Sequence, residues 1–423
     1  MSQNDFVTID GPGAFRTGLQ DINNNGQIVG MYQLPGGGPG VGTGIYRWFL
    51  YEGGKLTDFS LPGIPGAIPS AINNLGQIAG TYSVPSSAGA ETVYGFIDTN
   101  GTVTRLEPAP NTTYIRIIQI NDRGQVLGTY DARSAGGEHA FVYSNGTFTQ
   151  IDIPGAATGS SAAEAASPAG EVSPAAINNR GQVTGEYVQA TGDPAHPYKM
   201  VAFIDTGGKI TKIDPPFATS TMPMAINDKG QVVANHFGSE TAGAFIYDNG
   251  RIETISPPDA LDVTVHDINN AGQVVGTYTD KFLTPEPAGS FGAHGFVYKD
   301  GTFTEITAPD GAPTFPLRIN DVGQVIGTYP SATAGVVGHG FLASVPAAGT
   351  QPPAPGAVDW AALIAGLQSN DLIPLAPTLA QTVATTAEML RQNFATFGRD
   401  MLNLTGSTGA TAARYGGLPA AHL

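Results

Sequence analysis

Residues capable of chemistry precede one short recurring phrase, Ile-Asn-x-x-Gly-Gln, in four of its seven copies. They are two carboxylates, an amide and a guanidinium, and a histidine stands beside the second carboxylate: Asp21, Gln119, Asp267, Arg318 and His266. Two carboxylates and a histidine at one site could bind a cation or a sugar, or could transfer protons in a lyase or hydrolase. An arginine between two carboxylates more commonly completes a structural ion network, so both interpretations stay open.

The first copy also shows the oxygen pattern of a calcium loop. Asp21, Asn23 and Asn25 alternate before Gly26, as side-chain ligands do in such loops. No acidic residue follows at the later position that completes a calcium loop. Calcium at these three residues is therefore the one metal that the pattern suggests, and we expect no other cofactor.

Further polar side chains depart from the repeat. Glu186 replaces a threonine and His236 replaces a tyrosine, and ligand binding competes there with simple variation on a strand. Histidines also precede the recurring phenylalanine in three units, at His139, His294 and His339. Because these three fall in separate units, we expect no shared metal and predict hydrogen bonds between neighbouring units instead.

The phrase that positions these residues sets the period of the chain. A period of about 50 residues indicates a solenoid, a propeller or an array. Each copy is followed by an alternating stretch, as in 125–130, then by a small-Phe-aliphatic-Tyr phrase, a tight turn and a phrase such as 148–152. Alternation of apolar and polar residues predicts strands. With the strand that leads into the motif, these segments give four strands in each unit. The copies begin at Ile22, Ile72, Ile120, Ile177, Ile226, Ile268 and Ile319.

The phrase itself is typical of a hairpin turn. Its first asparagine can fold its side chain onto backbone N–H groups two residues on. Its glycine can supply the positive φ that closes a type I turn with a bulge. Every unit needs the same turn, so we interpret the recurring Asn, Gly and Gln as structural residues rather than as ligands.

Four strands in each of seven units predict an all-β fold, a seven-bladed β-propeller of four-stranded blades. The last unit stops after its third strand near Phe341, and a matching fourth-strand phrase stands at residues 6–10. We therefore expect an N-terminal strand to close the ring, which removes two exposed edges. Exchange of this strand between two molecules is the alternative.

The balance of charges bounds the partners. The 423 residues include 19 Lys and Arg against 35 Asp and Glu, and the formal net charge of −16 disfavours nucleic acid. The absence of Cys excludes disulfides and thiolate metal sites. The sequence has no run of about 18 apolar residues, so no membrane span is expected. Its start lacks the basic and apolar regions of a secretory signal peptide.

Composition changes after Val345, where Pro and Ala become frequent. Caps at Asp359 and Thr378 begin two predicted helices, and the apolar stripe of the second helix needs a partner. That partner is the propeller or another subunit, which would give a homo-oligomer; the alternative is an uncleaved export signal. The predicted divisions are a propeller at 1–345, a Pro/Ala-rich linker at 346–358, a short α-helical extension at 359–405 and a disordered tail at 406–423.

The phrases HAFVY at 139–143 and INDRGQVLGTY at 120–130 resemble the bacterial HAF-repeat proteins, which are named after their His-Ala-Phe tripeptide. The resemblance covers residues 5–345, although four units depart from the His-x-Phe pattern. It implies an extracellular bacterial repeat protein with no established catalytic residues. Without a signal peptide, export by a leaderless route is expected, and the cytoplasm is the alternative.

Three functions are open at this point. The first is a non-enzymatic, exported propeller that binds a glycan, peptide or protein through loops on one face, such as 34–46 and 279–293. The second is a propeller lyase or hydrolase with its polar site at the channel mouth. The third is a self-assembling structural protein joined through the C-terminal helix or the closing strand.

Overall fold

The computed structural model describes residues 6–345 except for 36–44, 86–90, 110–111, 133–137, 154–155, 157–171, 194–196, 239–241, 281–291 and 332–336. The linker, helical extension and tail predicted for 346–423 lie outside the described residues. Within the described part, no helix is long and apolar enough to cross a membrane.

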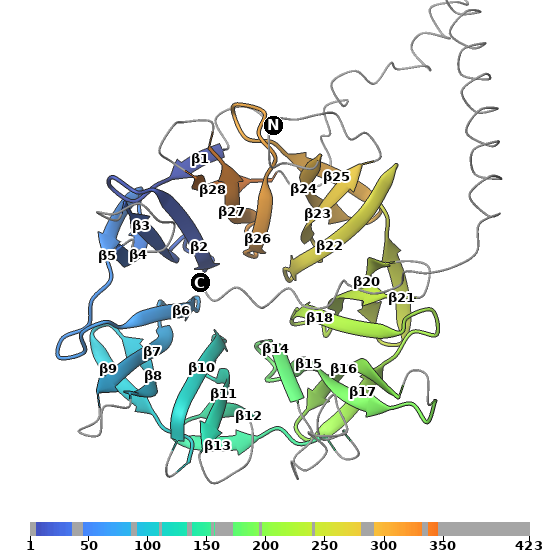
Figure 1. Cartoon of the computed structure of the whole chain (residues 1–423), viewed down its shortest axis with the longest axis horizontal. Coiled ribbons are helices and arrows are strands. Elements are labelled where there is room, and N and C mark those ends of the chain that lie inside the picture. The colour runs from blue at the N-terminus through green and yellow to red at the C-terminus, as the bar shows by residue number, and fades with distance from the viewer. Residues whose placement is uncertain are drawn as a thin grey trace, which may run out of the picture. The chain divides into compact units, whose positions relative to one another are not determined.

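The described residues form short strands in an order that repeats with the motif (Figure 1). The first strand of each unit ends at the motif isoleucine: β2 (Arg16–Ile22), β6 (Ile68–Ile72), β10 (Thr112–Ile120), β14 (Val172–Ile177), β18 (Ser220–Ile226), β22 (Ala260–Ile268) and β26 (Phe315–Ile319). The second strand follows the motif turn: β3 (Ile28–Leu34), β7 (Ile78–Pro85), β11 (Val126–Ala132), β15 (Val183–Ala190), β19 (Val232–Phe237), β23 (Val274–Asp280) and β27 (Gln324–Pro330).

The outer two strands of each unit contain the recurring phenylalanine and the phrase after it. The third strands are β4 (Ile45–Glu52), β8 (Glu91–Thr99), β12 (Glu138–Ser144), β16 (Tyr198–Thr206), β20 (Ala242–Asp248), β24 (Ala293–Lys299) and β28 (Gly338–Ser344). The fourth strands are β5 (Lys55–Asp58), β9 (Thr102–Leu106), β13 (Thr147–Gln150), β17 (Lys209–Ile213), β21 (Arg251–Ile255), β25 (Thr302–Ile306) and β1 (Phe6–Ile9).

Five units form separate four-stranded antiparallel sheets, and the remaining strands form one mixed sheet. In that sheet β1 pairs antiparallel with β28, from Phe6 opposite Ala343 to Ile9 opposite Gly340. A single parallel pair, Arg16 with Gly338, joins β2 to β28. The predicted all-β, propeller-like architecture and the meeting of N- and C-terminal strands are therefore confirmed. Figure 1 shows the first strands of all units pointing toward a common centre.

The motif turn has the same conformation in every unit. The motif glycines all adopt positive φ, from 70° at Gly124 to 83° at Gly230. The N–H of the first motif asparagine donates to the carbonyl of the motif glutamine, as from Asn121 to Gln125 at 3.0 Å. A register shift interrupts each first strand just before the motif, for example between Ile117 and Gln119. Such a bulge re-aims the residue that follows it, which places the pre-motif side chain toward the centre.

The core lies between neighbouring sheets rather than within one. Ala79 and Ile97 of one unit pack against Ile115 and Phe141 of the next. The recurring phenylalanine is fully buried in each unit, which explains why it recurs: Phe49, Phe96, Phe141, Phe203, Phe245, Phe296 and Phe341. Burying an aromatic ring of this size stabilises a fold by about 2–3 kcal/mol, so each interface is held mainly by apolar contacts.

Candidate functional site

The first motif asparagines link all units into a closed ring. The Nδ2 of each donates to the backbone carbonyl of the equivalent asparagine in the next unit, at 2.8 to 3.1 Å. The last of these bonds runs from Asn320 to Asn23, so the ring closes across the two ends of the fold. The members in order are Asn23, Asn73, Asn121, Asn178, Asn227, Asn269 and Asn320.

Each of these side chains is hydrogen-bonded through both its oxygen and its nitrogen; among the described residues, Asn269 and Asn320 make three such bonds, and the other five make four. In Asn121, Oδ1 accepts the N–H groups of Arg123 at 3.0 Å and Gln125 at 2.9 Å. Its Nδ2 donates to Gln125 Oε1 and to the Asn178 carbonyl, both at 2.8 Å. These four bonds use the whole capacity of an amide side chain, so we assign the recurring asparagine to the scaffold.

The next motif residue forms a second ring above the first. In each unit its backbone N–H donates to the side-chain Oδ1 of the equivalent residue in the following unit, at 2.7 to 2.8 Å. Three members are aspartates, and the Oδ2 of each accepts two asparagine amides. The members in order are Asn24, Asn74, Asp122, Asn179, Asp228, Asn270 and Asp321.

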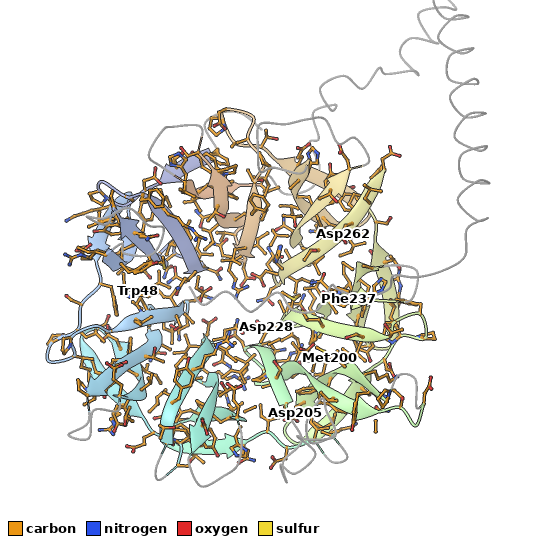
Figure 2. The ribbon with its side chains drawn as sticks, in the orientation of Figure 1. Trp48, Met200, Asp205, Asp228, Phe237 and Asp262 are labelled. Atoms are coloured by element: carbon orange, nitrogen blue, oxygen red, sulfur yellow. The ribbon has the colours of Figure 1, made fainter. Side chains whose placement is uncertain are left out.

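The two rings surround a polar cavity of about 140 Å³ at the centre of the fold. Figure 2 shows Asp228 close to this centre, whereas Asp205 lies farther out. Of the side chains that sequence analysis singled out, Asp21, Gln119, Asp267 and Arg318 line the cavity together. His266, one residue before Asp267, is not among its lining residues.

The pre-motif acceptors bind backbone N–H groups at the cavity wall. Asp21 accepts the N–H of Ile22 at 3.0 Å and that of Ile72, in the next unit, at 2.8 Å. Asp267 repeats this arrangement with Ile268 at 2.9 Å and Ile319 at 3.0 Å. Both carboxylates are therefore held in fixed orientations that join neighbouring units. Gln119 has the same role, since its Oε1 accepts the N–H of Ile177 at 2.8 Å.

Burial changes the protonation equilibria around the cavity. Desolvation raises the pKa of Asp21 to about 6, against the opposing effects of the Arg318 charge and the two backbone N–H groups. Desolvation also raises the pKa of Asp267, although Arg318 and its backbone partners again oppose the shift. Burial and the Arg318 charge lower the pKa of His266 to about 4, so this imidazole is neutral at pH 7.

Arg318 differs from the carboxylates because its head group has little to bind. Within the described part of the chain, its head group makes one hydrogen bond, a long one of 3.4 Å from Nη1 to the carbonyl of Leu317. Among the described residues, no ion pair joins it to Asp21 or Asp267. The closed ion network considered from the sequence is therefore not formed, since backbone N–H groups occupy the carboxylates.

The proposed calcium ligands are used in a different way. Asp21 accepts two N–H groups, and Asn23 Oδ1 accepts those of Asn25 and Gln27, each at 3.0 Å. Asn25 directs Nδ2 at the Asn74 carbonyl, at 3.2 Å. The oxygens of Asp21 and Asn23 already accept hydrogen bonds, and these N–H donors would compete with a cation for the same oxygens. Across the described residues, no group of three or more His, Cys, Asp or Glu is placed to hold a metal.

Glu186 and His236 lie away from the cavity. Glu186 is on β15, opposite Ser173 and Ala202, and its buried Oε2 has no hydrogen-bond partner among the described residues. Desolvation raises its pKa to about 7. His236 is buried beside Phe217, with ring centroids 5.0 Å apart, and burial lowers its pKa. It fills the aromatic position of its unit, which favours a packing role.

The histidines before the phenylalanine bind within their own units, so the prediction of hydrogen bonds between units was wrong. His294 Nδ1 lies 2.8 Å from Oε1 of Glu305 on the adjacent β25. His339 Nδ1 lies 2.6 Å from Oδ2 of Asp10, just after β1. The reason is register: the third-strand histidine faces the fourth strand of the same sheet.

Sequence analysis missed the ring aspartates Asp122, Asp228 and Asp321. The signal was present, because the third motif position is Asn or Asp in every copy. The Ile-Asn-x-x-Gly-Gln pattern leaves the third motif position variable. In every unit, however, the side chain at this position must accept an N–H from the neighbouring unit.

Comparison with known proteins identifies the fold. No protein-family model matches the chain, and no curated protein matches it. The β-propeller domain of the Trilobed protease from Pyrococcus furiosus is 12% identical with a TM-score of 0.52, covering 78% of this chain and 94% of that one. An acylaminoacyl peptidase from Pyrococcus horikoshii is 13% identical with a TM-score of 0.50 over 77% of this chain. This chain covers 51% of that enzyme, about half its length. The chain is therefore a β-propeller similar in fold to the propeller domains of proteases.

Proposed function

We propose that the chain is a seven-bladed β-propeller of the HAF-repeat kind, closed by β1, that binds a ligand without transforming it. The ligand is a glycan, a peptide or a segment of a protein, held at the mouth of the central cavity. The seven motif hairpins and the two hydrogen-bonded rings support this arrangement, because they hold the polar side chains in place before any ligand arrives.

One observation carries the proposal: the guanidinium of Arg318 lies in a polar cavity without an ion-pair partner among the described residues. A guanidinium presents five N–H donors in a planar fork that matches carboxylates and hydroxyl pairs. Asp21 and Asp267 flank it as fixed acceptors, and acceptors beside donors suit the hydroxyl groups of a sugar or the polar ends of a peptide.

The site also suits a second candidate, a lyase or hydrolase. With a pKa of about 6, Asp21 could exchange a proton near neutral pH. Binding without turnover is favoured because both oxygens of Asp21 and of Asp267 already accept backbone N–H groups. These bonds stabilise the ionised carboxylates and so weaken both groups as general bases.

The cavity does not lie at the loops between second and third strands, where the sequence predicts ligand binding. Loops such as 34–46 and 279–293 leave the second strands at the end opposite the motif turns, and much of each lies outside the described residues. The cavity opens among the motif turns themselves. We therefore propose ligand binding on the motif face.

Self-assembly and leaderless export remain proposals that concern residues 346–423. Light scattering on the full chain and on a chain ending at residue 352 would test assembly, since loss of an oligomer on truncation supports it. Recovery of the tagged full-length protein from cell pellets alone, with none in the culture medium, would contradict export.

The binding test uses the purified full chain and a panel of neutral and acidic oligosaccharides and short peptides, followed by calorimetry on any hit. We expect Arg318→Ala to weaken binding by about ten-fold or more, because a charge-assisted hydrogen bond is lost. Arg251→Ala, an exposed cation on β21, is the matched control and should bind normally. Turnover of a hit that stops in Asp21→Asn would establish the enzyme instead.

A further inference from the structure

The motif hairpins carry a rim of exposed side chains around the cavity. The fourth residue of each motif copy forms the tip of its hairpin and is solvent-exposed in every unit. Successive units follow one another around the ring, so chain order gives the order of these tips. They are Asn25, Leu75, Arg123, Arg180, Lys229, Ala271 and Val322.

Three consecutive tips form a cationic arc, which consists of Arg123, Arg180 and Lys229. Among the described residues, none of the three side chains makes an ion pair. The chain has 35 acidic and 19 basic residues, so three adjacent cationic tips form a local region of opposite charge on an acidic protein. Three cations left unpaired at the same position of adjacent units point to a negatively charged partner.

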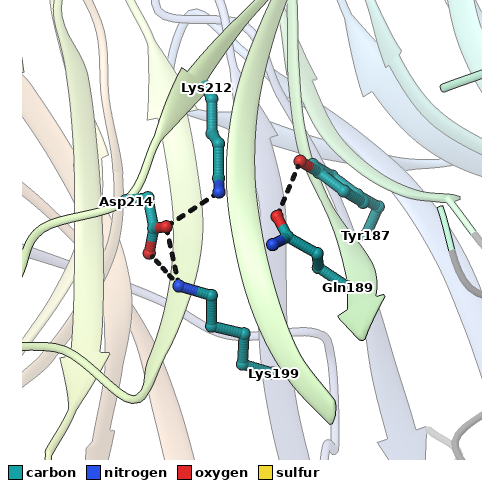
Figure 3. A network of polar contacts seen from close by, with 5 residues as sticks. All are labelled: Tyr187, Gln189, Lys199, Lys212 and Asp214. Atoms are coloured by element: carbon teal, nitrogen blue, oxygen red, sulfur yellow. Dashed lines mark hydrogen bonds and ion pairs between the residues drawn. The ribbon is translucent and has the colours of Figure 1, made fainter. Parts of the chain in front are cut away.

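A few other cations of the protein do form ion pairs. Figure 3 shows Asp214 between two lysines, with its Oδ2 2.7 Å from Lys199 Nζ and 2.9 Å from Lys212 Nζ. Arg105 likewise pairs with Glu107 at 2.9 Å. Ion pairs therefore form elsewhere, near the ends of β9 and β17, whereas the three cations of the arc make none among the described residues.

The acids closest to the arc in sequence are engaged by amide donors. The carboxylate of Asp122 accepts three hydrogen bonds from Asn74 and Asn179 at 2.8 to 2.9 Å. Asp228 accepts three from Asn179 and Asn270 at 2.7 to 3.1 Å. Both carboxylates keep their charge but are oriented by these donors within the second ring, and among the described residues neither makes an ion pair with a tip of the arc.

The remaining rim is uncharged and partly apolar. Leu75 is 65% exposed and Val322 is 64% exposed, which is high for residues of this size. Only Asn25 separates them, and Ala271 completes this side of the rim. These two exposed aliphatic tips could contact aliphatic side chains of a partner on the same face of the ring.

We infer that the rim docks an acidic segment of a partner protein, with its carboxylates over the cationic arc and its aliphatic side chains over Leu75 and Val322. The apolar side favours a protein over a polysaccharide, because a polyanionic sugar chain gains little from aliphatic contacts. Each exposed ion pair contributes little alone, so binding depends on the three cations together and weakens with salt. This surface lies outside the cavity and does not depend on Arg318.

The experiment uses the full chain and three fluorescent probes measured by anisotropy: a peptide of alternating Glu and Leu, a peptide of alternating Glu and Gly, and polygalacturonate. One variant reverses the arc: Arg123→Glu, Arg180→Glu and Lys229→Glu. The matched control reverses three exposed cations that each begin a fourth strand, Lys55→Glu, Lys209→Glu and Arg251→Glu, with the same change in net charge. A third variant is Leu75→Ser with Val322→Ser. Thermal melts establish that all variants fold.

We expect the Glu–Leu peptide to bind the wild type. Its affinity for the arc variant should be lower by about ten-fold or more, whereas its affinity for the control variant should stay within about three-fold of the wild type. The serine variant should bind the Glu–Leu peptide more weakly than the wild type does, and the wild type should bind the Glu–Gly peptide more weakly than the Glu–Leu peptide. Added salt should weaken binding in every case. No binding to the wild type in low salt would overturn the proposal, as would equal losses in the arc and control variants. Polygalacturonate binding as tightly as the Glu–Leu peptide, with the same dependence on the arc, would replace the protein partner by a polysaccharide.

Discussion

At the scale of single residues, Glu186 shows how one neighbour can leave a buried carboxylate oxygen without a hydrogen-bond partner among the described residues. The equivalent position in the next unit is Asn235, whose Oδ1 accepts the N–H of Val265 at 2.9 Å and whose Nδ2 donates to the carbonyl of the same residue at 3.1 Å. The residue that corresponds to Val265 for Glu186 is Pro223, on β18, which packs against β15. Proline has no N–H, so Glu186 finds no equivalent donor in this interface.

We therefore predict that Glu186→Gln stabilises the protein above neutral pH. Desolvation raises the pKa of Glu186 from 4.5 to about 7 in the folded state. Between these values the unfolded chain loses the proton while the folded protein keeps it, so stability falls as pH rises and levels off above about pH 7. The glutamine avoids this penalty and should gain about 2–3 kcal/mol at pH 8 but little at pH 4.5.

Urea unfolding at the two pH values measures this difference. Glu91→Gln, at an exposed position at the start of β8, is the control and should change little at either pH. A gain for Glu186→Gln that is the same at pH 4.5 and pH 8 would show that the carboxylate is not the cause.

Arg318 gives a second prediction at this scale. Its charge lowers the pKa of both Asp21 and Asp267, and desolvation raises them. Arg318→Ala removes the opposing effect, so the pKa of Asp21 should rise above about 6, and that of Asp267 should rise as well. Carboxyl chemical shifts followed by NMR across pH 4 to 8 measure both values. Unchanged titration curves would mean that the guanidinium lies too far from the carboxylates to influence them.

At the scale of elements, the motif hairpin is the unit that builds both the turn and the contact to the next sheet. We predict that Asn121→Ala costs about 2–4 kcal/mol, because it removes one buried and three partly buried hydrogen bonds and leaves the Asn178 carbonyl without its donor. Asn25→Ala, at an exposed hairpin tip with one bond of 3.2 Å, should cost about 0.5 kcal/mol or less. Chemical denaturation of both variants tests this; similar small losses would contradict the structural role of the ring.

The same element shows what the sequence could and could not predict. The hairpin follows from local chemistry, since Asn accepts backbone N–H groups and Gly124 takes a φ of 70°. The bonds between units depend on neighbours about 50 residues away, for which a single repeat has no local signal. Ring order predicts that Arg318 and Asp267 lie near each other, and both line the cavity. Their hydrogen-bond partners were not foreseeable, because these partners are backbone groups.

At the scale of the whole molecule, the short β1 strand completes the last unit. Phe6 stacks on Phe341 with ring centroids 5.0 Å apart and meets Tyr329 edge-on at 5.6 Å. Thr8 Oγ1 lies 2.7 Å from the hydroxyl of Tyr329, and Asp10 Oδ2 lies 2.6 Å from His339. These contacts join segments more than 300 residues apart, and loop closure over such a length costs considerable entropy. The closing strand therefore contributes to the stability of the whole ring rather than of one sheet.

We predict that removal of residues 1–10 lowers the melting temperature and exposes the free edge of β28, so that the truncated protein associates into dimers or larger species. A synthetic peptide of residues 5–12 added in trans should restore the monomer and part of the lost stability, because it can pair with β28 in the native register.

Phe6→Ala and Val7→Ala separate the contributions of the two side chains to this closure. Phe6 packs on two rings, whereas Val7 is 43% exposed, so only Phe6→Ala should weaken the closure. Light scattering and thermal melts measure both effects. A truncated chain that stays monomeric with an unchanged melting temperature would show that the rings at the motif face, from Asn320 back to Asn23, suffice to hold the propeller closed.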